Sequence, residues 1–138
     1  MKRTISVLLV AGAALAVAAP ASTHASGPVL VIQHQTRGCH AWSLNGGAFK
    51  ASQTLTVNRG THVEVGNNDV MPHKLVKVSG PVAKFVPGAM MNSAGEMSEI
   101  RFTKAGVYRF TTKAGEDYTN GIKTVGEDNV LRLTVRVP

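Results

Sequence analysis

The sequence predicts an all-β domain, an antiparallel Greek-key β-sandwich of about seven strands. Three observations support this fold class. Short stretches alternate between apolar and polar residues, as half-buried strands do. Turn-forming glycine, proline and asparagine recur about every 8–12 residues, which is typical of sandwiches. No helical period of apolar residues follows residue 26.

The first 25 residues have the organisation of a secretory signal peptide. Residues 1–3 are a short basic region, residues 5–19 are an apolar run, and small residues at 21–25 offer a cleavage site after Ala25. The apolar run is too short and wrongly flanked for a spanning helix, although an uncleaved anchor is the alternative. We therefore expect residues 26–138 to form one domain that is secreted or periplasmic, without a stable membrane span after cleavage.

The strands of this domain follow in order from the alternation and the turns. The first is rich in β-branched residues, and the last has the cleanest alternation, with leucines and valines on one face. A long connection at 79–96 follows the fifth segment, with room for a short helical turn within 89–95. The expected extended segments are 28–35, an irregular piece at 39–44, then 53–57, 63–65, 75–78, 98–102, 107–112 and 130–137.

The distribution of basic residues argues against a nucleic-acid-binding protein. The chain has 15 Lys and Arg against 8 Asp and Glu, which gives a formal net charge of +7. These residues are scattered singly along the strands rather than gathered into a stripe, as on a solvated surface. The charge supports only a mild preference for acidic partners or anionic cell surfaces.

Cys39 is the only cysteine of the chain. In an oxidising compartment an unpaired thiol is at risk unless it is buried, cross-linked between chains or bound to a metal as thiolate. The adjacent His40 and nearby His34 favour the metal. A Cys-His dipeptide alone does not indicate a cysteine protease, and no hydrolase motif or phosphate loop is present, so we do not expect an enzyme.

His73 lies where a loop returns to a strand. Val63 and Val65 alternate with polar residues, and the turn formers at 67–69 then end that strand. Pro72 restrains the backbone directly before His73. This arrangement is suited to holding an imidazole still at the end of a sandwich.

Two segments resemble the cupredoxins, the blue-copper sandwich family. Residues 57–73, VNRGTHVEVGNNDVMPH, are similar to the run V-x-x-G-x-x-V-x-F-x-N-x-x-x-x-x-H that delivers the first copper histidine in that family. Residues 100–110, IRFTKAGVYRF, are similar to the family's F-x-x-x-G-x-Y-x-Y/F strand pair. The resemblance covers roughly residues 28–138 and implies a cupredoxin-like fold with His73 as a copper ligand.

The chain departs from the family pattern at the other ligands. In cupredoxins the strand that corresponds to 107–112 leads into a loop with a cysteine, a second histidine and a methionine. Here Thr112 stands at the cysteine position, and residues 113–118, KAGEDY, contain none of these three residue types. A standard blue site cannot be built from that loop.

The resemblance places the loop after the first strand at the same end as His73. We therefore expect His34, Cys39 and His73 as ligands, with His40 as the rival second imidazole. Cys39 and His40 would point to opposite faces if both were extended, although a bend at Gly38 removes that objection. The Cys39 sulfur should then lie within about 4 Å of a His73 ring nitrogen, since each bonds one ion at about 2–2.3 Å.

A weak thioether would complete a His₂Cys set of the kind that suits copper. Met91 is the first candidate, with Met97 and Met71 as alternatives. Glu116 or Asp117 could supply a carboxylate instead. Trp42 is expected in the core or as a lid over the site, and His62 is expected to be silent because it leaves the strand on the wrong face.

These observations predict an exported copper-binding protein that serves in electron transfer or in copper binding and delivery. It would have a redox or copper-transfer protein as partner. The alternative from another class is a metal-free sandwich that acts as an adhesion or interaction module, with Cys39 buried or pairing between chains. A zinc or copper store without a redox role lies between the two.

Overall fold

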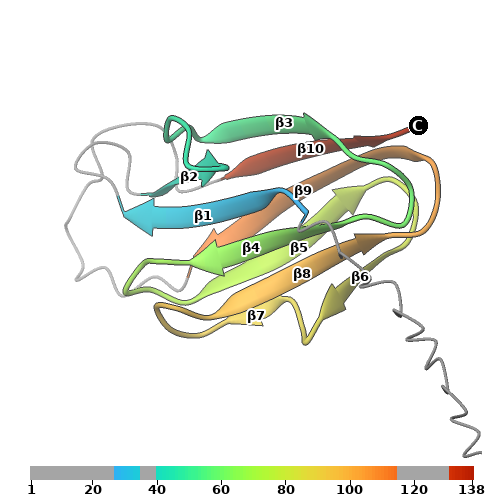
Figure 1. Cartoon of the computed structure of the whole chain (residues 1–138). Coiled ribbons are helices and arrows are strands. Elements are labelled where there is room, and N and C mark those ends of the chain that lie inside the picture. The colour runs from blue at the N-terminus through green and yellow to red at the C-terminus, as the bar shows by residue number, and fades with distance from the viewer. Residues whose placement is uncertain (1–26, 35–39, 115–130) are drawn as a thin grey trace, which may run out of the picture.

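The computed structural model describes residues 27–34, 40–114 and 131–138, with the side chains of residues 113 and 114 left out of the description. Ten strands and no helix occur in these ranges (Figure 1). None of the described residues forms a helix long and apolar enough to cross a membrane. The strands are β1 Val29–His34, β2 His40–Leu44, β3 Ser52–Thr56, β4 His62–Asn67, β5 His73–Ser79, β6 Ala83–Val86, β7 Met90–Met91, β8 Met97–Phe102, β9 Gly106–Ala114 and β10 Arg132–Val137.

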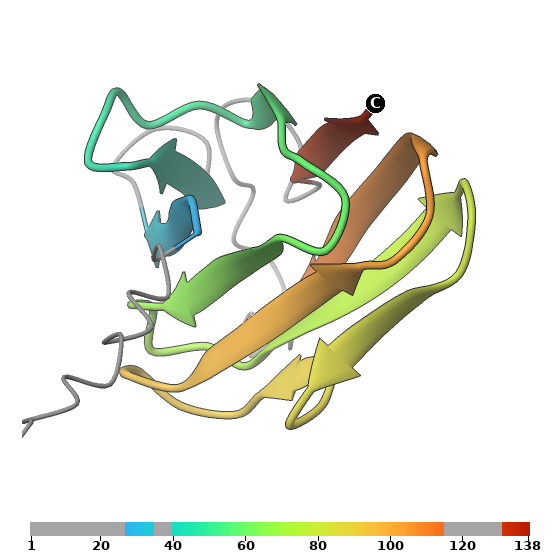
Figure 2. The ribbon, with the colours of Figure 1, turned by 45° about the vertical axis from the view of Figure 1, so that its right-hand side comes forward.

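The strands form two five-stranded sheets, in the orders β2-β1-β4-β8-β6 and β3-β10-β9-β5-β7. They pack as two layers of a sandwich (Figures 1 and 2). The predicted all-β sandwich is confirmed. Two pairings differ from the antiparallel expectation, because β1 runs parallel to β4 and β3 runs parallel to β10.

The connection expected at 79–96 contains two short strands and no helical turn. β6 pairs with β8, and the two residues of β7 pair with the start of β5. Both strands are too short to show an alternation in the sequence, and they depend on their partners for backbone hydrogen bonds.

The core lies between the sheets and follows the predicted alternation. β9 turns Tyr108 and Phe110 inward, and the two rings are packed with Phe102 of β8, whose centroid lies 4.9 Å from that of Tyr108. The Tyr108 hydroxyl donates to the Lys104 carbonyl at 2.6 Å, so its polar end is satisfied. Trp42 of β2 is fully buried among these residues, as expected of a core side chain.

The parallel pairing of β1 with β4 decides which residues meet at one end of the sandwich. Ile32 is opposite Asn67, so both strands run toward the same edge and the residues that follow them emerge together. The antiparallel pairing of β1 with β2 places His40 opposite His34 at that edge. β5 begins there with His73 after the short turn that follows β4.

Gly80 follows β5 and lies against the backbone of β9 in a left-handed conformation. Its φ is +100°, and a Cβ there would meet the Val107 carbonyl oxygen and, at 2.8 Å, the Tyr108 Cα. Gly80→Ala should lower the free energy of unfolding by about 2 kcal/mol or more, because a backbone clash adds to the strain of a left-handed residue. Gly95→Ala is the control, since Gly95 has φ +89° and open space around it, and should cost about 1 kcal/mol. Equal losses in urea denaturation would contradict this packing.

Candidate metal centre

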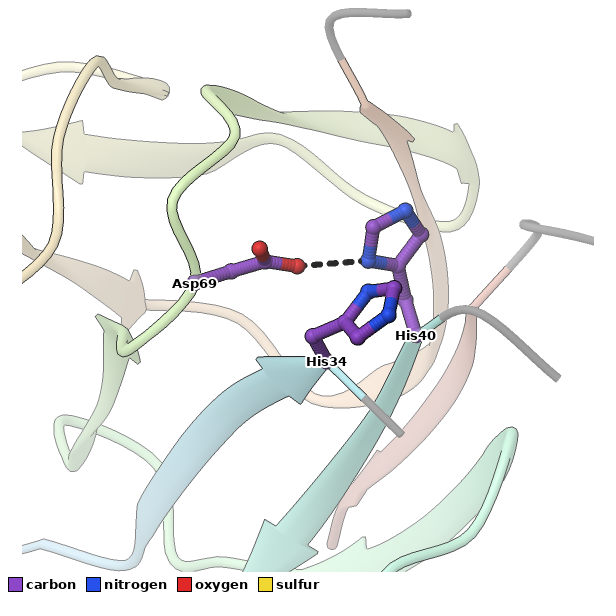
Figure 3. Close-up of side chains that lie close together, drawn as sticks. All are labelled: His34, His40 and Asp69. Atoms are coloured by element: carbon purple, nitrogen blue, oxygen red, sulfur yellow. Dashed lines mark hydrogen bonds and ion pairs between the residues drawn. The ribbon is translucent and has the colours of Figure 1, made fainter. Parts of the chain in front are cut away.

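Three histidines and one aspartate gather at the edge where β1 and β4 end and β2 and β5 begin. His34 and His40 come from the paired strands β1 and β2, and His73 is the first residue of β5. Asp69 lies in the turn between β4 and β5. Figure 3 shows the carboxylate of Asp69 directed at the His40 ring, with His34 beside it.

One carboxylate oxygen joins two buried imidazoles. Asp69 Oδ2 lies 2.6 Å from His40 Nδ1 and 3.2 Å from His73 Nε2. All three side chains are fully buried. The rings of His40 and His73 are perpendicular, with centroids 4.7 Å apart. This is a compact polar cluster inside an otherwise apolar sandwich.

The turn itself holds Asp69 in place. Its backbone N–H donates to Asn67 Oδ1 at 3.0 Å, and its Oδ1 accepts the Met71 N–H at 3.2 Å. Asn67 also donates its amide to the Met71 carbonyl at 2.9 Å. Asn and Asp favour such local side-chain-to-backbone bonds. The second oxygen, Oδ2, is therefore aimed at the histidines by the backbone of the turn.

The charge state of Asp69 follows from its partners. Burial alone would raise the pKa of Asp69, but hydrogen bonds from His73, from the Met71 N–H and from His40 outweigh it and lower the pKa below its ordinary 3.8. Burial lowers the pKa of His73 below its ordinary 6.5, against the opposing effect of the hydrogen bond to Asp69. At neutral pH the carboxylate is therefore ionised and the His73 ring is neutral.

An ionised carboxylate only accepts hydrogen bonds, so His40 Nδ1 and His73 Nε2 are the donors. In a neutral ring the opposite nitrogen then carries a lone pair. These nitrogens, His40 Nε2 and His73 Nδ1, are buried and have no hydrogen-bond partner among the residues that the structure describes. For His73, which burial holds neutral, Nδ1 therefore carries a lone pair of the kind that binds metals.

His34 forms the exposed rim of the cluster. Its ring meets the His40 ring edge to face, with centroids 5.9 Å apart. Donor atoms of His34, His40 and Asp69 all lie within 4.8 Å of one another. Bonds of about 2.0–2.2 Å from one ion span almost that separation, so a small closure of this set would bring all three onto a metal.

Met91 lies on the same inner face as His73. The two residues are directly opposite in the β5–β7 pairing, and both are fully buried. Side chains at opposite positions of an antiparallel pair have Cβ atoms about 4.5–5.5 Å apart. Met91 also belongs to the apolar core cluster.

The structure separates the other predicted candidates. Cys39, Glu116 and Asp117 lie outside the described residues, so the predicted distance from the Cys39 sulfur to His73 stays a prediction. Met97 is 48% exposed at the start of β8. His62 lies at the opposite end of β4 from Asn67, 3.6 Å from Glu64.

Asp69 is the residue that sequence reasoning missed. We assigned it to turn formation only, together with Asn67 and Asn68. Its position four residues before His73 was the available signal, because a carboxylate in the turn before a candidate ligand is well placed to bond it. Thr112, at the family's cysteine position, is buried opposite Leu75, and its hydroxyl has no partner within the described ranges.

Comparison with known proteins finds likenesses among solved structures only. No family model matches the chain, and no curated protein matches it. Amicyanin from Paracoccus versutus is 19% identical, with a TM-score of 0.47, over 85% of this chain and 86% of that one. A Cu(I) amicyanin variant is 17% identical, with a TM-score of 0.41, over 83% of this chain and 95% of that one. A purple cupredoxin from Nitrosopumilus maritimus is 18% identical, with a TM-score of 0.40, over 78% of this chain and 97% of that one.

Acid should destabilise the metal-free protein. Because the pKa of His73 is lowered in the folded state, the unfolded chain takes up a proton first as pH falls below 6.5. The pKa of Asp69 is also lowered in the folded state, so below pH 3.8 protonation of Asp69 reduces the free energy of unfolding further. We expect the free energy of unfolding to fall from pH 7 to pH 5, by at most about 1.4 kcal/mol per pH unit for one proton.

Urea denaturation of metal-free protein at several pH values measures this slope. His62→Gln is the control and should show the same slope of unfolding free energy against pH, because His62 lies outside the cluster. A flat profile between pH 7 and pH 5 would show that His73 is not held neutral by burial.

Proposed function

We propose that the protein is an exported copper-binding protein that works in electron transfer or in copper binding and delivery. One observation carries the proposal: His40 and His73 each give one nitrogen to Asp69 and keep the other buried without a partner among the described residues. A buried polar atom without a partner is costly, and a bound metal removes that cost.

The donor set fits copper. Imidazole nitrogen suits copper, and thiolate and thioether sulfur favour its reduced form. His40 Nε2 and His73 Nδ1 would hold the ion, with Met91 as a weak thioether on the face of His73. Cys39 precedes His40 in the chain and would supply the thiolate. Copper bound there would add one-electron exchange between Cu(I) and Cu(II).

Asp69 would act on the ligands through their other nitrogens. By accepting from both rings it fixes their tautomers and orientations, and its negative charge raises the basicity of the ligating nitrogens. Its burial keeps water from competing for these hydrogen bonds.

His34 would connect the centre to the outside. It is exposed, whereas His40 behind it is 1% exposed. A redox or copper-transfer partner would therefore approach at His34, whose ring contacts that of His40. Export rests on the signal-peptide pattern of residues 1–25.

A zinc-binding protein without redox activity is the second candidate. The set His34, His40 and Asp69, whose donor atoms lie within 4.8 Å, offers two nitrogens and one carboxylate oxygen. Zinc readily takes such ligands in tetrahedral geometry. In that arrangement Asp69 binds the ion directly instead of orienting the histidines.

Histidine substitutions should rank the ligands. His73→Ala and His40→Ala should each lower copper affinity by about 100-fold or more, since loss of a ligand's hydrogen-bond partner alone costs about 10–100-fold. His34→Ala should cost less, because His34 lies at the exposed rim. His62→Ala is the matched control and should change nothing. Competition titrations with a copper chelator give these affinities. If His62→Ala lowered copper affinity as much as His73→Ala, the proposed location of the site would be wrong.

Visible colour tests the role of Cys39. If copper is bound by the thiolate, the loaded protein absorbs in the visible range, and Cys39→Ser abolishes that band outright because the chain has no other thiol. A thiol reagent should modify metal-free protein, and copper should protect it. If the copper-loaded protein is colourless and its thiol still reacts, Cys39 is not a ligand. The nitrogen and oxygen ligands His34, His40 and Asp69 would then remain, and the zinc-binding function would be favoured.

A further inference from the structure

The outer face of the β3-β10-β9-β5-β7 sheet collects cations that are far apart in the sequence. Lys74 of β5, Arg109 of β9, and Arg132 and Arg136 of β10 are all exposed. They alternate with the inward-facing core residues of their strands, so they share one side of the sheet. Arg109 lies opposite Thr134, between Arg132 and Arg136, so these three arginines are neighbours in space, while Lys74 lies further along the same face.

The carboxylates of the described residues lie elsewhere. Glu64 and Glu99 are on β4 and β8 of the other sheet, and Glu96 lies in the turn before β8. Asp69 is buried in the metal centre. Within residues 27–34, 40–114 and 131–138, no carboxylate pairs with Arg109 or Arg132.

A groove of about 400 Å³ lies on this cationic face. Arg109, Thr111, Arg132 and Thr134 line it from β9 and β10, and Val78 closes it from β5. Val78 is the extra residue of a bulge: Lys77 is opposite Phe110 and Ser79 is opposite Arg109, with no partner between. The bulge leaves the Val78 side chain 62% exposed beside the arginines.

The strand register sets the arrangement of polar groups in the groove. Arg132 is opposite Thr111, and Thr134 is opposite Arg109. The two arginines thus occupy one diagonal of a square and the two threonines occupy the other, with diagonal neighbours about 7–8 Å apart. The side chains of two arginines and two threonines therefore lie on the outer side of one small area of the sheet.

In the part of the chain that the structure describes, no carboxylate neutralises the two arginines of the groove. Thr111 Oγ1 is buried and has no hydrogen-bond partner in the described part of the chain. The two guanidinium groups repel each other unless an anion lies between them. A ligand that brings several negatively charged oxygens would satisfy both guanidinium groups.

We propose that this groove binds a phosphate group, carried either by a soluble phosphate compound or by a lipid headgroup. Each guanidinium is a planar fork of donors that matches phosphate oxygens two at a time. Thr134 lies opposite Arg109 and offers a further hydroxyl to the ligand, whereas the buried Thr111 hydroxyl would have to rotate outward to reach it. Val78 gives the rest of the ligand an apolar wall. The site goes beyond the proposed copper function, because it lies on the opposite face of the sheet from His73.

Inorganic phosphate is the probe. Titrated into the purified protein, it should shift the backbone amide NMR signals of residues 109–111 and 132–134 in a saturable way. Arg109→Gln combined with Arg132→Gln should weaken binding at least tenfold. Arg59→Gln with Lys84→Gln removes the same charge from exposed positions outside the groove and should change the affinity less than twofold. Unchanged thermal unfolding temperatures show that both variants fold.

A double Arg→Lys variant distinguishes a specific phosphate site from nonspecific electrostatic attraction. Arg109→Lys with Arg132→Lys keeps the charge but removes the planar guanidinium that binds phosphate with two hydrogen bonds. If the geometry of the site matters, this variant should bind phosphate at least threefold more weakly. Binding to vesicles of phosphatidylcholine with phosphatidylglycerol, absent for phosphatidylcholine alone and competed by inorganic phosphate, would identify the lipid source. Phosphate binding without vesicle binding would identify a soluble one. Unsaturable shifts, or equal losses in the Arg59 and Lys84 control, would overturn the proposal.

Discussion

Asp69 Oδ2 accepts hydrogen bonds from two buried imidazoles, and this end of the sandwich depends on that shared acceptor. His40 and His73 are buried, and without the carboxylate each would hold an unpaired N–H donor, at a cost of about 1–3 kcal/mol. The carboxylate is itself costly to bury, and the Met71 N–H and the two rings compensate it. Each of the three groups thus offsets part of the cost of burying the others.

The same bond makes a potential ligand pair. The His73 ring, which burial holds neutral, gives one nitrogen to the carboxylate and carries a lone pair on the other, Nδ1. His40 Nε2 is also buried without a hydrogen-bond partner among the described residues. These two nitrogens make the polar cluster a candidate for metal binding as well as a core hydrogen-bond network.

Much of the fold was predictable because alternation records which face of a strand is buried. The leucines and valines of the last strand were placed on one face on that ground, and the structure buries Leu133, Val135 and Val137. Alternation says nothing about which strands become neighbours, so the parallel pairing of β1 with β4 was not predictable. β7 escaped notice because two residues show no period, and its strand character comes only from pairing with β5.

The site was predictable only in part, for a related reason. Pro72 and the turn before it marked His73, and the loop after the first strand marked His34 and His40. The turn formers hid the role of Asp69, since an aspartate in a turn needs no further explanation. The relative burial of His34 and His40 depends on how β2 enters the sheet, and the structure turns His40 inward while His34 stays exposed.

The two proposed sites use opposite faces of one pair of strands. Along β5, His73 and Leu75 face inward while Lys74 is exposed, and along β9 the buried Thr112 follows Thr111 of the groove. Side chains alternate with a period of two, so one register fixes both faces at once. A slip by one residue would expose the histidine and bury the cations. The apolar core between the sheets excludes that slip, and it thereby keeps the metal centre and the cationic groove on their separate sides.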